Sequence, residues 1–297
     1  MARFLGVISL FLLSGLLASQ DPVKRAGLTP KLCSIPGTRV LHIPVTPLAV
    51  PDSPLPETSG TAANGLAALT ISPGAADEPP EGPNGFDVMD DGSLLIVDPL
   101  RKRVAAYDKD SKFRKAWNIG FSADSLTVTA NGMVLIREAS TGQLHAFDRE
   151  GQAGSAEGAV LPEQAEAQVV KGENRGSVRR SANGNSVGKS LEIQLDKPGL
   201  TLLSIESLAI DPKGDTYVAL ETTASGGLSD AITLNKYVRK YSSDGKLLGE
   251  IGDIPLDYYV VPVDELRVRK GVVYQLQTTK SEVRVNEWDA NQACSHP

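Results

Sequence analysis

Four polar residues recur at one position of a repeated pattern and are the main candidates for chemistry. They follow a turn glycine by six or seven residues, and they are Asp98, Glu138, Glu221 and Gln277. Carboxylate and amide oxygens are the ligands that hard cations prefer, and they also bind polar molecules. If the four residues end strands around one rim, they form a loose ring suited to a divalent cation such as calcium or to a small polar ligand. We expect no other cofactor.

A structural role competes with this interpretation. An Asp at the end of a strand commonly folds back to accept hydrogen bonds from nearby backbone N–H groups. The sequence leaves both roles open, and it contains no further metal-ligating motif that decides between them.

Enzymatic motifs are absent from the sequence. It has no G-x-S-x-G, no H-E-x-x-H and no phosphate-binding loop. The three histidines, His42, His145 and His296, are too scattered to suggest a shared site. We therefore predict no catalytic residue and expect a binding protein rather than an enzyme.

The elements that carry these residues form a repeat. Residues 83–120 contain apolar segments at 86–89, 94–97, 103–107 and 113–119, separated by Asp- and Gly-containing turns. Four short strands within about 40 residues make one antiparallel unit. Partial copies follow at 125–151, 207–252 and 265–289.

The spacing predicts further units. First-turn glycines stand at 92, 132 and 214, so the second interval of 82 is about twice the first interval of 40. A diverged unit is therefore expected near 169–205. The segments 40–43 and 66–71 could form another from the N-terminal side.

The unit at 83–120, with its P-x-G-φ-x-V start and Asp/Gly turns, resembles NHL repeats. The resemblance implies a β-propeller, six-bladed in most relatives, and we predict an all-β propeller of five or six four-stranded blades. A β-sandwich is the competing fold. Gluconolactonase-type propellers are similar in architecture and hold a metal with Glu, Asn and Asp, but no motif here matches that set residue by residue. A three-histidine metal site resembling that of the amidating lyase propellers would need all three histidines.

Two segments depart from the repeat. Residues 44–83 carry nine of the nineteen prolines, which favours an extended, poorly paired connection. Residues 151–188 are rich in Gly, Ala, Glu and Ser and predict a flexible insertion, with a basic stretch at 175–181 that is either solvated or a docking site for an acidic partner. The predicted organisation is a signal peptide at 1–19, a Pro-rich N-terminal segment at 20–85 with a partial blade, and repeats at 86–292.

The N-terminus predicts export. Arg3 precedes an apolar run at 4–17, and the small residues Ala18 and Ser19 offer a cleavage site. A retained anchor is the alternative. We expect a secreted protein, extracellular or periplasmic in a bacterium, with no transmembrane segment after cleavage. An oxidising compartment and the even count predict a Cys33–Cys294 disulfide between the chain ends.

The charge limits the partners. A net charge of −6 and a pI near 5.2 argue against nucleic acid, which needs a positive field. We expect a monomer that binds an unknown protein or a small polar ligand at the mouth of the propeller channel. A metal-assisted hydrolase or lactonase on the same fold is the alternative, and a stalk or surface-layer component is a third possibility.

Overall fold

The structure is a computed structural model. It describes residues 34–48, 66–75, 77–156, 165–170, 174–182, 185–186, 190–195, 197–225 and 232–292. The chain divides into two units, Met1–Leu32 and Cys33–Pro297, and every described residue belongs to the second. The predicted signal sequence and both cysteines lie outside the described residues.

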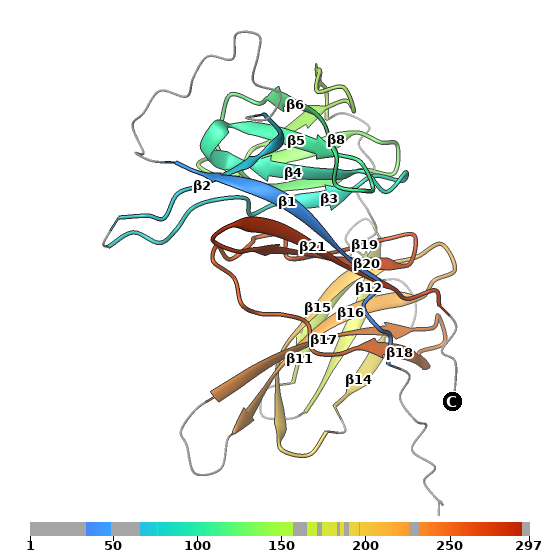
Figure 1. The fold of residues 1–297 in the computed structure, drawn as a ribbon. Helices are drawn as coiled ribbons and strands as arrows, with labels where there is room; N and C mark the ends of the chain where they lie inside the picture. Colours follow the sequence, from blue (N-terminus) through green and yellow to red (C-terminus); the bar gives the residue numbers. More distant parts are fainter. Residues whose placement is uncertain are drawn as a thin grey trace, which may run out of the picture. The chain divides into compact units, whose positions relative to one another are not determined.

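The clearest repeat folds as predicted into one antiparallel sheet (Figure 1). Its strands are β3 (Phe86–Val88), β4 (Leu94–Asp98), β5 (Arg103–Tyr107) and β6 (Phe113–Asn118). The turn between the first two strands needs Gly92, whose φ of 83° is in the left-handed region that side chains disfavour. A 3-10 turn, η1 (Pro99–Arg101), joins β4 to β5.

Two further sheets have the same meander order. The first contains β7 (Ala123–Val128), β8 (Val134–Glu138), β9 (Leu144–Phe147) and β10 (Ala153–Gly154). The second contains β15 (Leu200–Ile210), β16 (Thr216–Ser225), β17 (Ile232–Tyr241) and β18 (Leu247–Ile251). The strands of the second sheet are longer than the repeat predicts.

The C-terminal repeat is completed by the N-terminal part of the chain. Its sheet has the order β19-β20-β21-β1-β2. The bounds are β19 (Leu266–Arg269), β20 (Val272–Thr278), β21 (Glu282–Asp289), β1 (Arg39–Pro47) and β2 (Leu69–Ile71). The expected separate N-terminal unit is therefore not formed. Since β21 has a free edge, β1 pairs with it antiparallel and buries Leu41 and Ile43.

The predicted flexible insertion at 151–188 contains three strands of a further sheet, and the fourth strand, β14 (Leu191–Gln194), follows it where the diverged unit was expected. The three strands are β11 (Ala165–Val169), β12 (Arg175–Ala182) and β13 (Asn185–Ser186). Val178 and Ile193 are buried with Leu202 and Leu220, and this packing outweighs the polar composition. A diverged unit thus exists between the repeats, but residues 200–205 belong to β15 in the next sheet rather than to this one.

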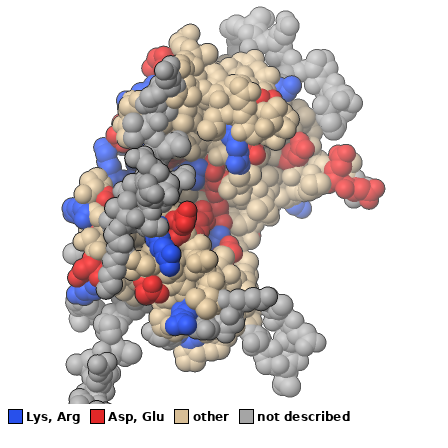
Figure 2. Space-filling model, turned by 180° about the vertical axis from the view of Figure 1, so that it is seen from behind, with Lys and Arg blue, Asp and Glu red and all other residues tan. Residues whose placement is uncertain are grey.

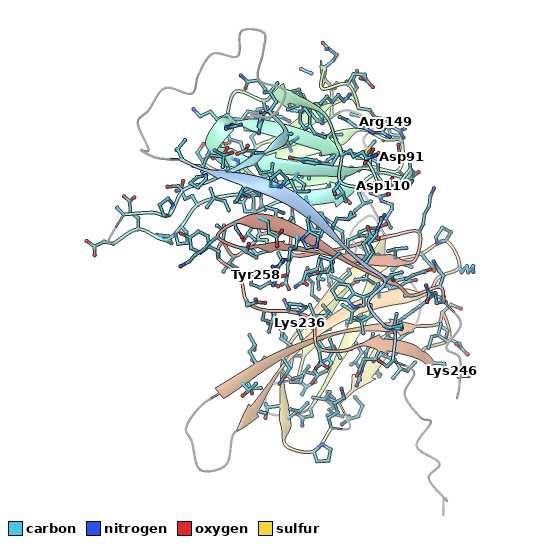
Figure 3. The ribbon with its side chains drawn as sticks, in the orientation of Figure 1. Asp91, Asp110, Arg149, Lys236, Lys246 and Tyr258 are labelled. Atoms are coloured by element: carbon cyan, nitrogen blue, oxygen red, sulfur yellow. The ribbon has the colours of Figure 1, made fainter. Side chains whose placement is uncertain are left out.

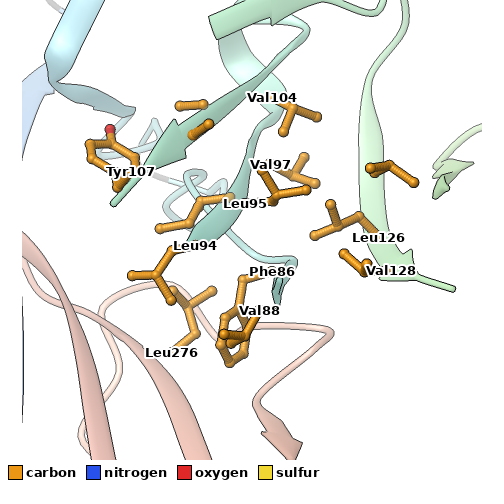
Figure 4. Packing of buried hydrophobic residues seen from close by; sticks show 14 of the residues in the cluster. Phe86, Val88, Leu94, Leu95, Val97, Val104, Tyr107, Leu126, Val128 and Leu276 are labelled. Carbon is orange, nitrogen blue, oxygen red and sulfur yellow. The ribbon is translucent and has the colours of Figure 1, made fainter. Parts of the chain in front are cut away.

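Apolar side chains pack at the contacts among three of the sheets. Phe86, Leu94, Leu126 and Leu276 come from β3, β4, β7 and β20, and all are buried in one cluster (Figure 4). Burying each of these side chains contributes about 1.5–3 kcal/mol relative to exposure. This cluster holds β3–β6 between the neighbouring sheets.

The segment before β1 joins its own sheet to the β15–β18 sheet. Ile35 donates its N–H to the Glu250 carbonyl on β18 at 2.9 Å, and its side chain packs in a cluster with Ile251 and Trp288. Three residues later, Thr38 donates its N–H to the Glu287 carbonyl on β21 at 2.7 Å. The N-terminal segment thus spans β18 and β21.

Candidate functional site

Asp98 has a structural role. It ends β4 with its side chain fully buried, and Oδ2 accepts from Arg103 Nε at 3.0 Å and from Thr70 Oγ1 at 3.2 Å. Burial raises the carboxyl pKa despite the charge of Arg103. Arg103 also donates to the carbonyls of Leu66 and Ala68. Asp98 therefore orients an arginine that holds the segment before β2.

Glu138 ends β8 as predicted and is bound within its own sheet. Its oxygens accept from Ser140 Oγ at 2.9 Å and contact His145 Nε2 at 3.2 Å, and the hydrogen bond from Ser140 is the largest cause that lowers its pKa. Phe121 stacks on His145 with ring centroids 4.3 Å apart. Because Ser140 and His145 both contact the carboxylate, this group does not have the serine-to-histidine contact of a nucleophilic triad.

Glu221 belongs to a partly buried ionic cluster that the sequence did not predict. Lys236 on β17 lies between Glu221, 2.8 Å away on the adjacent β16, and Glu265, which precedes β19. Burial by itself would lower the Lys236 pKa, but the two carboxylates outweigh it and the pKa is raised. Ser204 also donates to Glu221 at 2.9 Å. Glu221 lies inside β16 rather than at its end, because β16 continues to Ser225.

Gln277 is connected to the same cluster through a chain of hydrogen bonds. Glu265 accepts from Tyr258, whose hydroxyl also accepts from Gln275 Nε2 at 2.7 Å. Asn286 Nδ2 lies 3.0 Å from Gln275 Oε1 and 3.4 Å from Gln277 Oε1. Gln277 in turn donates to Asp257 Oδ1 at 2.6 Å. We call the residues linked in this way the polar network: Ser204, Glu221, Lys236, Asp257, Tyr258, Glu265, Gln275, Gln277 and Asn286.

The polar network joins two sheets. In Figure 3, Lys236 on β17 and Tyr258 on the 252–265 connection both lie between the ribbons of the β15–β18 and β19–β21 sheets. It therefore brings Glu221 and Gln277 together. Among the described residues, Asp98 and Glu138 have partners outside the polar network, so the four candidates do not form one ring.

Glu206 on β15 stands in a recess beside the polar network. Its side chain is open to solvent, yet desolvation by the surrounding protein raises its pKa. Lys236, Arg267, Glu265 and Glu221 are close enough to act on its charge. Because an exposed carboxyl that is also desolvated has protein around it, we infer that Glu206 lines a recess. Figure 2 shows Asp and Glu side chains in a hollow of the face that it presents.

Arg267 extends the charged surroundings to the next two sheets. It pairs with Asp264 at 2.6 Å and donates to the carbonyls of Phe86 on β3 and Leu126 on β7, each at 3.2 Å. Asp264 also accepts the Leu126 N–H at 3.0 Å. Charged side chains thus line the first strands of four consecutive sheets, namely β15, β19, β3 and β7.

A sequence signal for part of the network existed. Gln275 and Gln277 alternate in a strand whose other residues are mostly apolar, so both amides share one buried face. Lys236, Tyr258 and Glu265 gave no comparable signal, because their contacts join residues of different sheets.

A metal centre is not assembled by the residues that the structure describes, among which no three His, Cys, Asp or Glu side chains gather in a metal-holding group. A shallow cavity of about 230 Å³ lies elsewhere, between β14 and the turn at Ser242–Gly245, and none of its lining residues belongs to the polar network. Among the described residues, no helix is long and apolar enough to span a membrane.

The sheets define an all-β fold of the propeller type, with four-stranded antiparallel meanders in chain order and one sheet completed by N-terminal strands. No protein-family model and no curated protein matches the chain.

The solved structures described next resemble this chain only remotely. A streptogramin B lyase is 9% identical, with a TM-score of 0.36 over 85% of this chain and 98% of that one. A gluconolactonase from Xanthomonas campestris is 12% identical, with a TM-score of 0.35 over 85% and 98%. The calcium-binding protein regucalcin from Agrobacterium tumefaciens is 11% identical, with a TM-score of 0.32 over 70% and 91%. These likenesses carry no argument about what this chain binds or converts.

Proposed function

We propose that the protein is an exported, non-catalytic β-propeller. It binds a protein or a small polar ligand at the mouth of the channel, near the polar network. The observation that supports this is the saturation of that network. Glu221, Lys236 and Glu265 each contact at least two polar partners. Carboxylate and ammonium groups that already contact two polar partners are suited to fix the form of a binding surface rather than to accept or donate protons in a reaction.

Export is part of the same proposal. The signal-like residues 1–20 support it, and so does the place of the cysteines in the sequence. Cys33 directly precedes Ser34, which bridges to Glu250, and Cys294 follows β21, which pairs with β1. Since the chain runs from Cys33 into β1 and from β21 to Cys294, and β1 pairs with β21, we infer a disulfide between the chain ends in an oxidising compartment.

The alternative is a metal-assisted hydrolase or lactonase on the same fold, holding a divalent cation such as calcium. It would need carboxylate and amide oxygens that converge on one point. Asp98, Glu138 and Glu221 instead accept hydrogen bonds from different neighbours, and this dispersal favours binding.

Metal analysis of the purified mature protein, combined with a panel of lactones and esters, tests the proposal. We expect no stoichiometric metal, no turnover and no rise in melting temperature at millimolar calcium. Stoichiometric metal together with turnover that is lost on chelation would overturn the non-catalytic assignment.

A further inference from the structure

A projecting hairpin lies ahead of β3. Residues 72–75 leave the sheet and residues 77–81 return to it, closed by two backbone hydrogen bonds between Ser72 and Glu81 at 2.8 and 3.0 Å. Gly74 has a φ of 74°, and a Cβ there would lie 2.4 Å from the Glu78 carbonyl oxygen, so only glycine fits. Pro79 and Pro80 restrict the returning arm. Figure 1 shows this hairpin, in cyan, extending away from the sheets. We call it the acidic finger.

The carboxylates of the acidic finger are free. Asp77, Glu78 and Glu81 are exposed, and among the described residues no cation lies within ion-pair distance of them. Most other exposed acids of the described chain either pair with a cation, as Glu150 does with Lys115, or cap a turn, as Asp148 does at 2.8 Å. Three uncompensated charges on a stiff projection attract a positively charged partner.

Two valines are held out to solvent at the base of the finger. Val261 and Val263 are 75% and 52% exposed, whereas Pro262 between them is buried. Both valine side chains thus face solvent, on either side of a buried proline. The backbone is fixed on both flanks, because Val260 N–H donates to Thr278 Oγ1 at 2.9 Å and Val263 N–H donates to the Asn84 carbonyl at 2.7 Å.

The finger and the valines form one surface. Gly82, directly after the finger, packs so closely on the valine segment that a Cβ there would lie 3.3 Å from Val260 Cγ2. Asn84 accepts the N–H groups of both Val263 and Asp264. Asp264 is also the partner of Arg267, so this surface borders the charged recess described above.

We propose that the acidic finger and Val261–Val263 form a docking surface for an extended, Lys- or Arg-rich segment of another protein that also carries small apolar side chains. This inference rests on the proposed binding function and gives the partner a chemistry. Complementary charge supplies the rate of encounter and the choice of partner. Rigid, β-branched valines supply apolar contact area while losing little side-chain freedom when they are covered.

Fluorescence anisotropy with the full mature chain tests the surface. The probe is a fluorescein-labelled peptide of alternating Lys and Val, and its counterpart has Glu in place of each Lys. We expect only the basic peptide to bind, with an affinity that falls as ionic strength rises. D77N/E78Q/E81Q should weaken binding about tenfold and flatten the salt dependence. V261S/V263S should weaken binding about fivefold at every ionic strength.

A charge-matched control separates the finger from net charge. E150Q/E166Q/E192Q removes three exposed acids elsewhere and should bind the peptide as wild type does. G74A keeps every charge but distorts the finger, and it should weaken binding as well. Equal binding of the two peptides, or equal losses in the finger and control variants, would refute the docking surface.

Self-association is the competing outcome. If the chain dimerises in light scattering and R175Q/R179Q abolishes the dimer, the occupant is the basic β12 of a second copy and the proposal of a different partner is overturned. If the basic peptide does not bind and the protein has neither metal nor turnover, the docking surface is refuted and the non-catalytic assignment stands. Turnover on the substrate panel, together with intact peptide binding, would remove the non-catalytic assignment alone.

Discussion

Two contacts between sheets differ in the side chains that form them: one is mainly apolar, and the other also contains charged groups. Where β3–β6 meets its neighbours, the side chains of Phe86, Leu94 and Leu126 pack in an apolar cluster, and the charged Arg267 reaches the backbone carbonyls of Phe86 and Leu126 rather than their side chains. Where β15–β18 meets β19–β21, an apolar cluster around Trp288 is accompanied by the charged trio Glu221, Lys236 and Glu265. A buried ion pair is often no more stabilising than apolar residues of similar volume. The difference indicates that the first contact stabilises the fold, and that the second shapes the surface where we place binding.

The largest expected effect breaks the apolar contact. Phe86→Ala should lower the free energy of unfolding by about 4 kcal/mol, because it removes a fully buried ring and leaves a cavity. Urea denaturation measures the loss. Val261→Ala, at an exposed position, is the control and should change stability by less than about 0.5 kcal/mol. A loss below about 1 kcal/mol for Phe86→Ala would show that the cluster is not the main stabilising contact.

Removing the central cation should break the polar contact. Lys236→Met leaves Glu221 and Glu265 without their shared partner, and we expect a loss of about 3 kcal/mol at neutral pH. The triple variant K236M/E221Q/E265Q removes the uncompensated charges and should recover most of that stability. If K236M alone is as stable as wild type, the trio is not coupled as described.

The chain ends sharpen the comparison, because the segment from Ser34 spans both sheets of the polar contact. If Cys33 and Cys294 are linked, Cys33→Ser should lower the free energy of unfolding by about 2–3 kcal/mol. Cys294→Ser should have the same effect, and a reducing agent should reproduce it in wild type only. Thiol labelling of unreduced, exported protein at both cysteines would exclude the bridge.

The smallest effect concerns the pH dependence of stability at Glu206, in the recess, and at Glu221, in the polar network. Desolvation raises the Glu206 pKa, so the stability that Glu206 contributes is present below its unfolded pKa and is lost as the pH rises through its folded pKa. Glu206→Gln should therefore be more stable than wild type at neutral pH, by less than about 1 kcal/mol because the side chain is open to solvent. The gain should vanish below about pH 4, under the ordinary glutamate pKa.

Glu221 provides the opposite sign. Burial would raise its pKa, but the hydrogen bonds from Lys236 and Ser204 and the charge of Lys236 outweigh burial and lower the pKa. Its contribution is present above the unfolded pKa and is lost as the pH falls through the folded pKa. Glu221→Gln should therefore lose stability at neutral pH. Melting curves of the two variants across acidic to neutral pH measure both effects, and the same sign in both would contradict the described recess.

Local patterns predicted some elements well and others poorly. The strands of 83–120 are confirmed, because alternating apolar residues and an Asp-Gly turn specify a hairpin within a few residues. Residues 165–182 were predicted to be flexible, but Val178 packs against the following sheet and makes β12 a strand. Composition could not show this, because the apolar residues that bury Val178 lie further along the chain.

The candidate site divides in the same way. Asp98 and Glu138 end their strands as the repeat predicted, whereas Glu221 does not, because the hairpin of β16 and β17 is longer than the repeat. The alternation of Gln275 and Gln277 was visible in the sequence, but Asn286, which connects their amides, comes from the next strand. No periodicity reports such a contact across strands.

The sequence by itself determined the polar position of the repeat, because this position follows from the number of residues between the turn glycine and the end of the next strand. It determined Asp98 and Glu138 as the last residues of their strands, and Gln277 as the residue before the last, in this way. The tertiary structure decided which of these residues meet, because ion pairs and hydrogen bonds depend on distance in space. It joined Glu221 to Gln277 through Lys236, Glu265 and Tyr258, left Asp98 and Glu138 with neighbours of their own, and used the N-terminal strand to complete the last sheet.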